Sequence, residues 1–427
     1  MTNDGAGTSV VRRPPFGTNP LVGERGTDTR RRILAAGLEV FAETGFNGAR
    51  VELITERAGC SRPALYQYFS SKDDVFWQLA GEVGEEMVEL AQQLPKVTPD
   101  AEGLAALTGW VDAFMDLHAT YAPVFSAFQA ASRDHQHTVR RSSAISDRTG
   151  DALLRAFGAR RTKRGRTLVT GLVAVLIRCS LYAEHLTGAA DRRPLVDGLA
   201  QLLHRTFFGA IDGVNVRPPA RDGRRPAGAA PDLPEPGGRP LRPRGEKTRQ
   251  RLLDAGASVL PSRGFHDARV DDIVEAAGVS HGTFYRYFEH KDDFFRVLAE
   301  ASVSPMVEML DDLRPGAEEG ELRAWLRDWF DVYEGNGGVI TTWQEMRTRD
   351  ELAAYSQQVG LAVIARLSRV LAPRGFGNPD VDAVILLALI ERIPYSVFTL
   401  GFADRDGAID AMVTVLHRGF MGLTDPL

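Results

Sequence analysis

The chain is poor in cysteine, with only Cys60 and Cys179 among its 427 residues. Two cysteines so far apart in the sequence exclude a disulfide framework and a zinc site built on cysteine ligands. Scarce cysteine is typical of a protein from a reducing compartment.

Long hydrophobic runs are missing as well. The longest, residues 172–177 and 384–390, are far shorter than the roughly 20 residues that span a bilayer. The N-terminus also lacks the apolar stretch of a signal peptide. We therefore expect a cytoplasmic protein with no membrane partner.

An excess of positive charge is absent, since the formal net charge is −5 and the pI is near 6.0. This balance argues against a protein that coats nucleic acid non-specifically, although a local basic face can coexist with an acidic body. With 44% hydrophobic and 25% charged residues the composition is that of a globular protein. The length predicts two or more domains.

One small module is present twice. Residues 29–74 return without a gap at residues 248–293, so that Thr29 matches Thr248 and Lys72 matches Lys291 at one constant offset. Roughly half of the paired positions are identical, and the identities fall on turn glycines, core apolar residues and a Tyr-x-Tyr-Phe run. Compositional bias is a poor explanation for such a match.

Apolar residues recur at helical spacing through most of the chain, which predicts an all-α fold. The predicted domains are a disordered arm (1–26), a first module (27–74), a first long-helix domain (75–212), a linker rich in proline, glycine and arginine (213–245), a second module (246–293) and a second long-helix domain (294–427). A flexible linker of this length spans about 30 Å, so the two halves could lie side by side.

Each module follows the plan of a helix-turn-helix. In the first copy, a helix is expected to stop at Gly45, a second to cover residues 50–58, and a third to run from Arg62 to about Phe69. Gly59 permits the sharp turn between the last two, and Ser61 can cap the third helix by accepting a backbone N–H. In such a motif the later helix enters the major groove of DNA.

Several runs of residues identify the module more closely. They are Gly45–Phe46, Ala58–Gly59–Cys60–Ser61, Leu65–Tyr66–Gln67–Tyr68–Phe69 and Ser71–Lys72–Asp73–Asp74, with Gly264–Phe265, Ala277–Gly278–Val279–Ser280, Phe284–Tyr285–Arg286–Tyr287–Phe288 and Lys291–Asp292–Asp293 in the second copy. These runs resemble the tetracycline-repressor (TetR) family of bacterial transcription regulators. The resemblance implies two tandem units, each with a three-helix DNA-binding domain and a helical domain for ligand binding and dimerisation.

The resemblance also implies which residues meet DNA. In the first copy Arg62, Pro63, Ala64 and Tyr66 would face bases, and Gln67, Tyr68 and Lys72 would face phosphates; in the second copy His281, Gly282, Thr283 and Tyr285 would face bases, and Arg286, Tyr287 and Lys291 phosphates. Arginine can bond to guanine, small apolar groups can meet a thymine methyl, and tyrosine and lysine can hold phosphates. Alternatively, Arg62 is a solvated charge and Lys72 only begins a helix, while Phe69 and Phe288 are expected in the core.

Three features depart from the family pattern. Arg50 and Arg269 occupy the start of the second helix, where the family has Thr or Ser, and Pro261 is expected to shorten or kink the first helix of the second copy. The second copy is therefore the one expected to bind DNA more weakly. We interpret the arginines at positions 12, 13 and 30–32 as a solvated basic tail rather than as a minor-groove arm.

Each of the two modules is a potential DNA reader. Two readers in one chain suggest an internal pseudo-dimer, because helix-turn-helix proteins place two recognition helices about 34 Å apart. A weak sequence similarity between residues 173–182 and 386–395 supports this arrangement, and it aligns Arg178 with Glu391. Since the two readers differ, a chain that uses both should prefer an asymmetric operator. A chain that uses only the first would form a homodimer and select a palindrome.

Aromatic and polar residues recur at helical spacing in both long-helix domains. They are Trp110, Phe114, His118, Tyr121 and Phe125, and Trp325, Trp329, Tyr333 and Trp343. They either pack in the core or line an apolar pocket with a few polar anchors. The resemblance implies a small-molecule effector, and an effector that fits such a pocket would be hydrophobic.

The sequence thus predicts a transcription regulator on double-stranded operator DNA, in its simplest form a repressor that a hydrophobic ligand modulates. The alternative is a ligand-sensing or protein-binding scaffold with weakened readers. An enzyme is not expected, because the Asp134, His135 and His137 group has the wrong helical spacing for a metal site, and no phosphate loop or nucleophile elbow occurs. No cofactor is expected.

Overall fold

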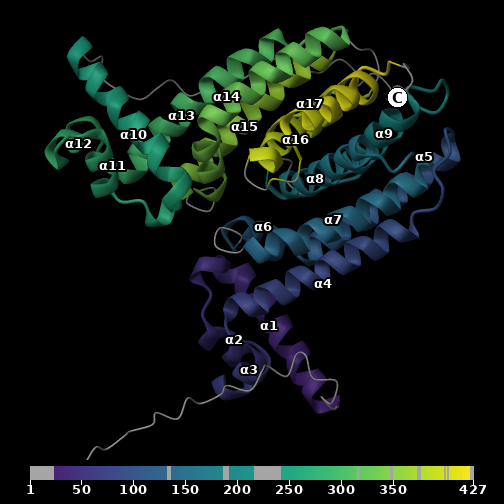
Figure 1. Ribbon diagram of the computed structural model, residues 1–427, viewed down its shortest axis with the longest axis horizontal. Helices are drawn as coiled ribbons and strands as arrows, with labels where there is room; N and C mark the ends of the chain where they lie inside the picture. The colour runs from purple at the N-terminus through teal and green to yellow at the C-terminus, as the bar shows by residue number, and fades with distance from the viewer. Residues whose placement is uncertain are drawn as a thin grey trace, which may run out of the picture. The chain divides into compact units, whose positions relative to one another are not determined.

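The computed structural model describes residues 24–131, 136–185, 192–215, 242–314, 317–346, 350–372, 377–398, 401 and 403–423. Every regular element in these ranges is a helix, which confirms the predicted all-α fold (Figure 1). Most of the predicted arm (1–23) and of the predicted linker (216–241) lie outside the described residues. The chain forms two compact units, one of Met1–Met87 with Leu117–Ser142 and one of Val88–Asp116 with Ser143–Leu427.

The helices of the second half repeat the order of those in the first. The first half contains α1 (Glu24–Gly48), α2 (Val51–Ala58), α3 (Arg62–Tyr68), α4 (Lys72–Gln93), α5 (Ala101–Thr120), α6 (Ala122–Ala131), α7 (Gln136–Ala156), α8 (Lys163–His185) and α9 (Arg193–Phe208). The second contains α10 (Pro243–Asp267), α11 (Val270–Ala277), α12 (His281–Tyr287), α13 (Lys291–Met309), the short 3₁₀ helix η3 (Leu310–Asp312), α14 (Glu319–Met346), α15 (Asp350–Leu371), α16 (Pro379–Phe398), α17 (Arg405–Thr414) and the π-helical turn η5 (Val415–Phe420).

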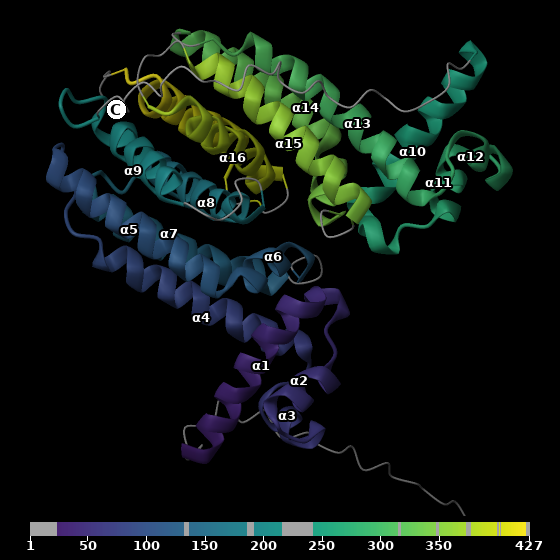
Figure 2. The same cartoon turned by 180° about the vertical axis from the view of Figure 1, so that it is seen from behind.

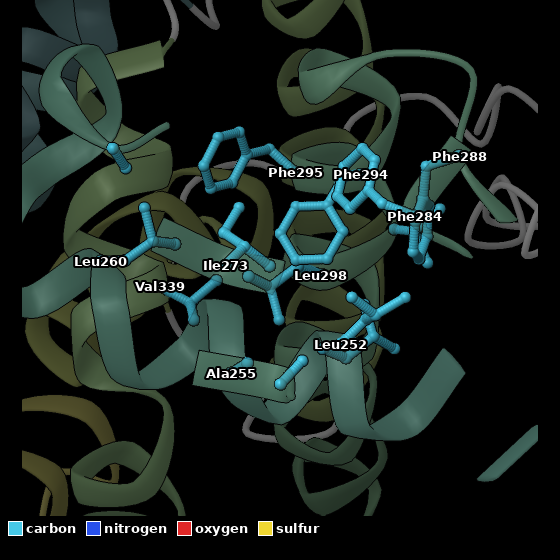
Figure 3. Packing of buried hydrophobic residues seen from close by; sticks show 14 of the residues in the cluster. Leu252, Ala255, Leu260, Ile273, Phe284, Phe288, Phe294, Phe295, Leu298 and Val339 are labelled. Carbon is cyan, nitrogen blue, oxygen red and sulfur yellow. The ribbon is translucent and has the colours of Figure 1, made fainter. Parts of the chain in front are cut away.

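The two modules have equivalent cores. Ile33, Ile54 and Leu65 are fully buried in the first module, and their counterparts Leu252, Ile273 and Phe284 are fully buried in the second. In the second core the aromatic rings of Phe284, Phe288 and Phe294 lie close together (Figure 3). Burial of one face of each short helix against the others holds helices that would be marginal alone.

Pro261 was expected to shorten or kink the first helix of the second module; the shortening is wrong, and the kink stays a prediction. Helix α10 continues beyond Pro261 to Asp267 and has 25 residues, the same as α1. Proline removes one hydrogen bond from the helix. Burial of Leu252, Leu253 and Leu260 on the core side of α10 outweighs that loss.

Helices of the two halves pack together within the second unit. Helix α16 packs against α8 and α9, and both views show these three helices side by side (Figures 1 and 2). The turn η5 packs against α9. The helices approach closely at Gly198, where an added Cβ would lie 2.6 Å from Val381 Cγ1. Any larger residue at position 198 would therefore push α9 and α16 apart.

Two buried arginines bond across this packing in opposite directions. Arg205 Nε donates to the carbonyl oxygen of Gly419 at 2.7 Å, and Arg418 Nη2 donates to that of Phe207 at 3.0 Å. Arg205 and Arg418 occupy the same place in a repeated His-Arg-x-Phe-x-Gly pattern, found at positions 204–209 and again at 417–422. The pattern is a sequence signal of this packing that our sequence interpretation missed.

Among the described residues, one segment, Lys163–Tyr182 in α8, is long and apolar enough to cross a membrane. Half of it is buried in the protein, and it packs against α16 and α17. We assign it to the protein core, because its apolar side chains already have protein neighbours.

Candidate nucleic-acid interface

The turn before each recognition helix has the geometry that its sequence predicts. Gly59 and Gly278 adopt left-handed backbone conformations, with φ of 61° and 62°. Ser61 Oγ accepts a hydrogen bond from the N–H of Ala64 at 3.3 Å. Ser280 Oγ accepts one from the N–H of Thr283, also at 3.3 Å. The predicted turn and cap are therefore present in both modules.

The recognition helices α3 and α12 expose the same kind of surface. Tyr66 is 50% exposed and Tyr285 54%, whereas Phe69 and Phe288 are each only 2% exposed. This confirms that the phenylalanines lie in the core. The other exposed predicted contacts are Arg62, Pro63, Gln67, His281, Gly282 and Arg286, while Ala64, Tyr68, Thr283 and Tyr287 are half-buried. Exposed tyrosines on a short, fixed helix can reach bases or phosphates.

The first residue of each recognition helix is paired with the preceding helix. Arg62 on α3 forms an ion pair with Glu52 on α2, and His281 on α12 contacts Asp271 on α11. The two pairs are equivalent, because Arg62 aligns with His281 and Glu52 with Asp271 in the repeat. Arg62 is therefore not simply solvated. A contact with a base requires its guanidinium either to break the ion pair with Glu52 or to bond to both groups at once.

Lys72 has a structural role that the sequence interpretation did not consider. Its Nζ donates to the carbonyl oxygens of Phe46 at 2.8 Å, Ala49 at 3.1 Å and Asn47 at 3.4 Å, and lies 4.8 Å from the centre of the Phe46 ring. These carbonyls follow the bend of α1 at Gly45, where the helix leaves acceptors unpaired. The phosphate contact of Lys72 remains a prediction. Lys291 in turn lies over the ring of Phe295, at 5.6 Å.

The interpretation of residues 30–32 as a solvated tail is wrong for Arg30 and Arg32, which belong to α1. Arg32 Nη1 donates to the carbonyl oxygen of Ala58 at the end of α2, at 3.2 Å. Its counterpart Arg251 donates to that of Ala277 at the end of α11. The last carbonyls of a helix have no partner within it, and an arginine side chain supplies one. Arg12 and Arg13 lie outside the described residues.

Arg50 and Arg269, which depart from the family pattern, precede α2 and α11, and these two helices begin in different ways. The Arg50 side chain makes no capping bond to α2, as its departure from the family pattern suggested. In the second module Asp272 Oδ2 accepts a hydrogen bond from the backbone N–H of Arg269 at 2.8 Å. This bond orders the start of α11 without a Ser or Thr.

Three tryptophans among the predicted ligand contacts use their indole N–H for structure. Trp110 donates to the carbonyl oxygen of Leu90 at 3.0 Å, and its counterpart Trp325 donates to that of Met309 at 2.9 Å. Both acceptors lie in the last turn of a helix. Trp329 donates to the carbonyl oxygen of Ile390 at 2.9 Å. Trp343 lies in α14, but its side chain is outside the described residues.

His118 is the most unusual of the predicted ligand contacts in the first half. Its side chain is buried, and neither ring nitrogen has a hydrogen-bond partner among the described residues. The ring stacks on Phe125 at 4.4 Å between centroids. Burial lowers the pKa of His118 to about 4, so the ring is neutral near pH 7. Tyr121 donates to Glu86 at 2.5 Å, while Phe114 is buried.

A small apolar cavity lies beside Trp110 in the second unit. It is lined by Trp110, Leu153, Phe157, Val169, Leu172, Val173, Leu176, Leu203 and Phe207 and measures about 10 Å³. This is room for about one water molecule, whereas pockets for small ligands measure roughly 300–1,000 Å³. Side chains would have to move before a larger molecule could enter.

Metal chemistry has no obvious location in the described part of the chain, where no group of three or more His, Cys, Asp or Glu residues could hold an ion. Asp134 and His135 lie outside the described residues, and His137 has no described side chain. Cys179 is buried, and burial raises the pKa of its thiol far above the ordinary range.

Comparisons with known proteins agree with the geometry of the modules. The family of bacterial regulatory proteins called tetR matches the chain twice, at residues 33–79 and 252–298. The chain is 28% identical over 193 residues to the HTH-type transcriptional activator FasR of Mycolicibacterium smegmatis, in a match that covers 44% of this chain and 87% of that protein.

Two further relatives are shorter matches. The uncharacterized HTH-type transcriptional regulator YdgC of Bacillus subtilis is 43% identical over 58 residues, 14% of this chain and 30% of that protein. The HTH-type transcriptional repressor SCO4008 of Streptomyces coelicolor is 32% identical over 93 residues, 22% of this chain and 44% of that protein. The chain therefore spans less than half the length of these two relatives.

Proposed function

We propose that both readers of this chain act together on one DNA operator. The premise is that the chain belongs to the tetR family of bacterial regulatory proteins and carries the family's N-terminal domain twice. The chain would then be a transcription regulator in which one polypeptide supplies what two subunits usually supply. It would act in the cytoplasm, where chromosomal DNA is found in bacteria.

The observation that carries this proposal is the packing of α8 and α9 on α16 and η5. Arg205 and Arg418 bond to carbonyls across this packing in opposite directions, which is the pattern of a self-complementary dimer interface. An interface of this kind inside one chain supports an internal pseudo-dimer. A homodimer of such chains would bring four readers together.

The two readers differ in the residues that would face bases. The first presents Arg62 and Pro63 where the second presents His281 and Gly282, while Tyr66 and Tyr285 agree. Arginine can bond to two acceptors of guanine, which histidine does less well. An operator with two unlike half-sites follows from this difference.

The direction of regulation is proposed to be repression. A protein bound across an operator blocks polymerase by occupancy alone, without any further contact. The relatives include a protein named as an activator and one named as a repressor. A small, largely hydrophobic effector that binds the long-helix domains would modulate DNA binding by changing the spacing of the readers.

A second candidate is a sensing scaffold whose readers bind DNA weakly. It is favoured by the pairs Arg62–Glu52 and His281–Asp271, which place a carboxylate beside the leading basic residue of each recognition helix. A carboxylate there repels phosphates and competes with bases for the basic side chain.

The test is selection of randomised duplex DNA by the full-length protein, followed by affinity measurements at two salt concentrations. We compare the wild type with Arg62→Ala/Tyr66→Ala, with His281→Ala/Tyr285→Ala, and with the exposed control Arg193→Ala on α9. Each reader variant should lose about 10- to 100-fold in affinity for the selected site, and each should relax specificity in only one half-site.

The outcomes separate the candidates. An asymmetric site, with each reader variant affecting its own half, supports the pseudo-dimer. A palindrome that only the first reader variant weakens contradicts it and indicates pairing of two chains. No enriched site, with affinities that neither reader variant changes, supports the scaffold.

A further inference from the structure

A buried polar cluster lies where α8 and α14 pack against α16, within the second unit. It consists of two arginines, one glutamate and three tyrosines: Arg178 and Tyr182 on α8, Tyr333 on α14, and Glu391, Arg392 and Tyr395 on α16. The cluster thus contains two guanidinium groups but one carboxylate. Buried charges are stabilised only when they are paired, so the second guanidinium is the notable feature.

The carboxylate of Glu391 is already used by α8. Arg178 donates to Glu391 Oε2 from Nη2 at 2.8 Å and from Nε at 3.2 Å, and Tyr182 donates to the same oxygen. Burial lowers the pKa of Arg178, but Tyr182 and Glu391 together raise it above its ordinary value. Arg178 is therefore a compensated charge.

Arg392 lacks a carboxylate of this kind. Its guanidinium lies over the ring of Tyr395 at 4.5 Å, and its Nε is buried without a hydrogen-bond partner. Burial lowers the pKa of Arg392, and the positive charge of Arg178 lowers it further, which together outweigh the opposing effects of Tyr333 and of Tyr395, which also hydrogen-bonds to it. A cation held in this way favours an added anion.

Tyr333 supplies a second unused polar group nearby. Its side chain is 1% exposed, and its hydroxyl has no hydrogen-bond partner among the described residues. Burial raises the pKa of Tyr333 above its ordinary value, the negative charge of Glu391 raises it further, and the positive charges of Arg392 and Arg178 act in the opposite direction. The Tyr333 ring stacks with Phe398 at 6.1 Å, and Phe398 is 37% exposed and also near Phe330. Phe398 therefore connects the cluster to the protein surface.

The first half has a different environment at the equivalent position. Trp110, Phe114 and His118 on α5 correspond to Trp325, Trp329 and Tyr333 on α14, with the same spacing within each set. Both His118 and Tyr333 are buried with unused polar atoms. The pKa of His118 is shifted by burial alone, with no contribution from a charged neighbour. An excess of positive charge distinguishes the second half.

We propose that the second half binds an effector with one carboxylate and an apolar body, which accepts hydrogen bonds from Arg392 Nε and the Tyr333 hydroxyl. A carboxylate has two oxygens for these two donors and supplies the missing counter-charge. The apolar body lies against Phe330 and Phe398 after Phe398 moves aside. The regulatory meaning of this site rests on the proposed function, but binding itself does not.

The experiment is calorimetric titration of the full-length protein with dodecanoate and naphthoate, each compared with its neutral amide. The variants are Arg392→Gln and Tyr333→Phe, with Arg193→Gln on α9 as an exposed control. At least one carboxylate should bind the wild type and the control more than tenfold more tightly than its amide does. Arg392→Gln should remove this preference, and Tyr333→Phe should reduce it.

A second measurement tests the charge without any ligand. Arg392→Gln should raise the thermal midpoint of the ligand-free protein or leave it unchanged, because it removes a partly buried cation that has no carboxylate partner. A lowered midpoint contradicts the proposal. Equal binding of carboxylate and amide, a preference that survives in Arg392→Gln, or no binding of either carboxylate would also overturn it.

The affinity for selected DNA is measured on the same proteins, which separates this inference from the proposed function. Specific DNA binding without carboxylate binding leaves the function standing and removes the site. Carboxylate binding without specific DNA binding supports the site and contradicts the function.

Discussion

Arg178 on α8 and Glu391 on α16 occupy equivalent positions in the two halves, and they bond directly to each other, with 2.8 Å between Nη2 and Oε2. Equivalent residues meet each other only next to the axis that relates two halves. The pair therefore supports the pseudo-dimer that we propose. Its opposite charges favour pairing of unlike halves, because two first halves would bring Arg178 against Arg178.

We expect Arg178→Glu to destabilise the chain strongly, because it places a second carboxylate beside Glu391 in a largely buried site. Breaking a buried ion pair costs about 3–5 kcal/mol. The exchange Arg178→Glu/Glu391→Arg should recover most of this loss, measured as the thermal midpoint and by urea unfolding. If the exchanged protein is as unstable as the single variant, the pair does not act through its charges.

Replacement of Lys72 should affect stability more than DNA affinity. Lys72→Met removes hydrogen bonds from an ammonium group to three carbonyls at the end of α1. A hydrogen bond to a charged group has a net contribution of about 1.5–3 kcal/mol to the free energy of unfolding. The exposed Lys96→Met is the matched control. The measurements are urea unfolding and the salt dependence of DNA binding. A stable Lys72→Met protein whose salt slope falls by about one would instead assign Lys72 to a phosphate.

Trp329 is expected to compensate for a proline in α16. Pro394 has no N–H, so the carbonyl of Ile390, one helical turn earlier, lacks its helical partner, and the Trp329 indole donates to it. Trp329→Phe should cost about 1–3 kcal/mol by leaving this buried carbonyl unpaired, in addition to lost packing. Pro394→Ala should restore part of the loss in the double variant, because alanine supplies the N–H. Equal unfolding of the single and double variants in urea would contradict this role.

His118 should make stability fall as the solution becomes acidic. The pKa of His118 is about 4 in the folded protein, below the 6.5 of an exposed histidine, so the unfolded chain binds a proton that the folded one does not. The stability that the neutral, buried His118 ring contributes to the folded protein is complete above pH 6.5 and is lost as the pH falls from 6.5 to 4. Between pH 7.5 and 5 the loss is about 2 kcal/mol.

The matched variant for this prediction is His118→Phe, which keeps a ring against Phe125 and cannot titrate. Thermal midpoints measured from pH 7.5 to pH 5 should fall less for His118→Phe than for the wild type. Parallel curves for the two proteins would mean that His118 gains a proton as readily when folded as when unfolded.

Local features of the fold were predictable from the sequence. Helix period, the turn glycines Gly59 and Gly278 and the capping serines Ser61 and Ser280 depend on residues within a few positions of one another. The repeat at a constant offset showed that both modules have the same plan. Phe69 and Phe288 could be assigned to the core because their spacing from Tyr66 and Tyr285 separates an inner from an outer face.

The partners of long polar side chains could not be predicted in the same way. The phosphate contact expected of Lys72 stays a prediction, but the sequence did not show that its ammonium group reaches carbonyls at the end of α1, or that Arg32 reaches the end of another helix. The direction of a flexible side chain depends on which acceptors the packed helices leave unpaired. Sequence spacing does not contain that information.

The sequence by itself determined that this protein is helical, that it carries one DNA-reading module twice, and which glycines and serines form the turn before each recognition helix, because these properties depend on short-range spacing. Only the tertiary structure decided that Arg178 meets Glu391, that Arg205 and Arg418 bond across the halves, and that Arg392 and Tyr333 keep unused polar atoms. These contacts join positions far apart in the chain, and they form only when whole helices pack and exclude water.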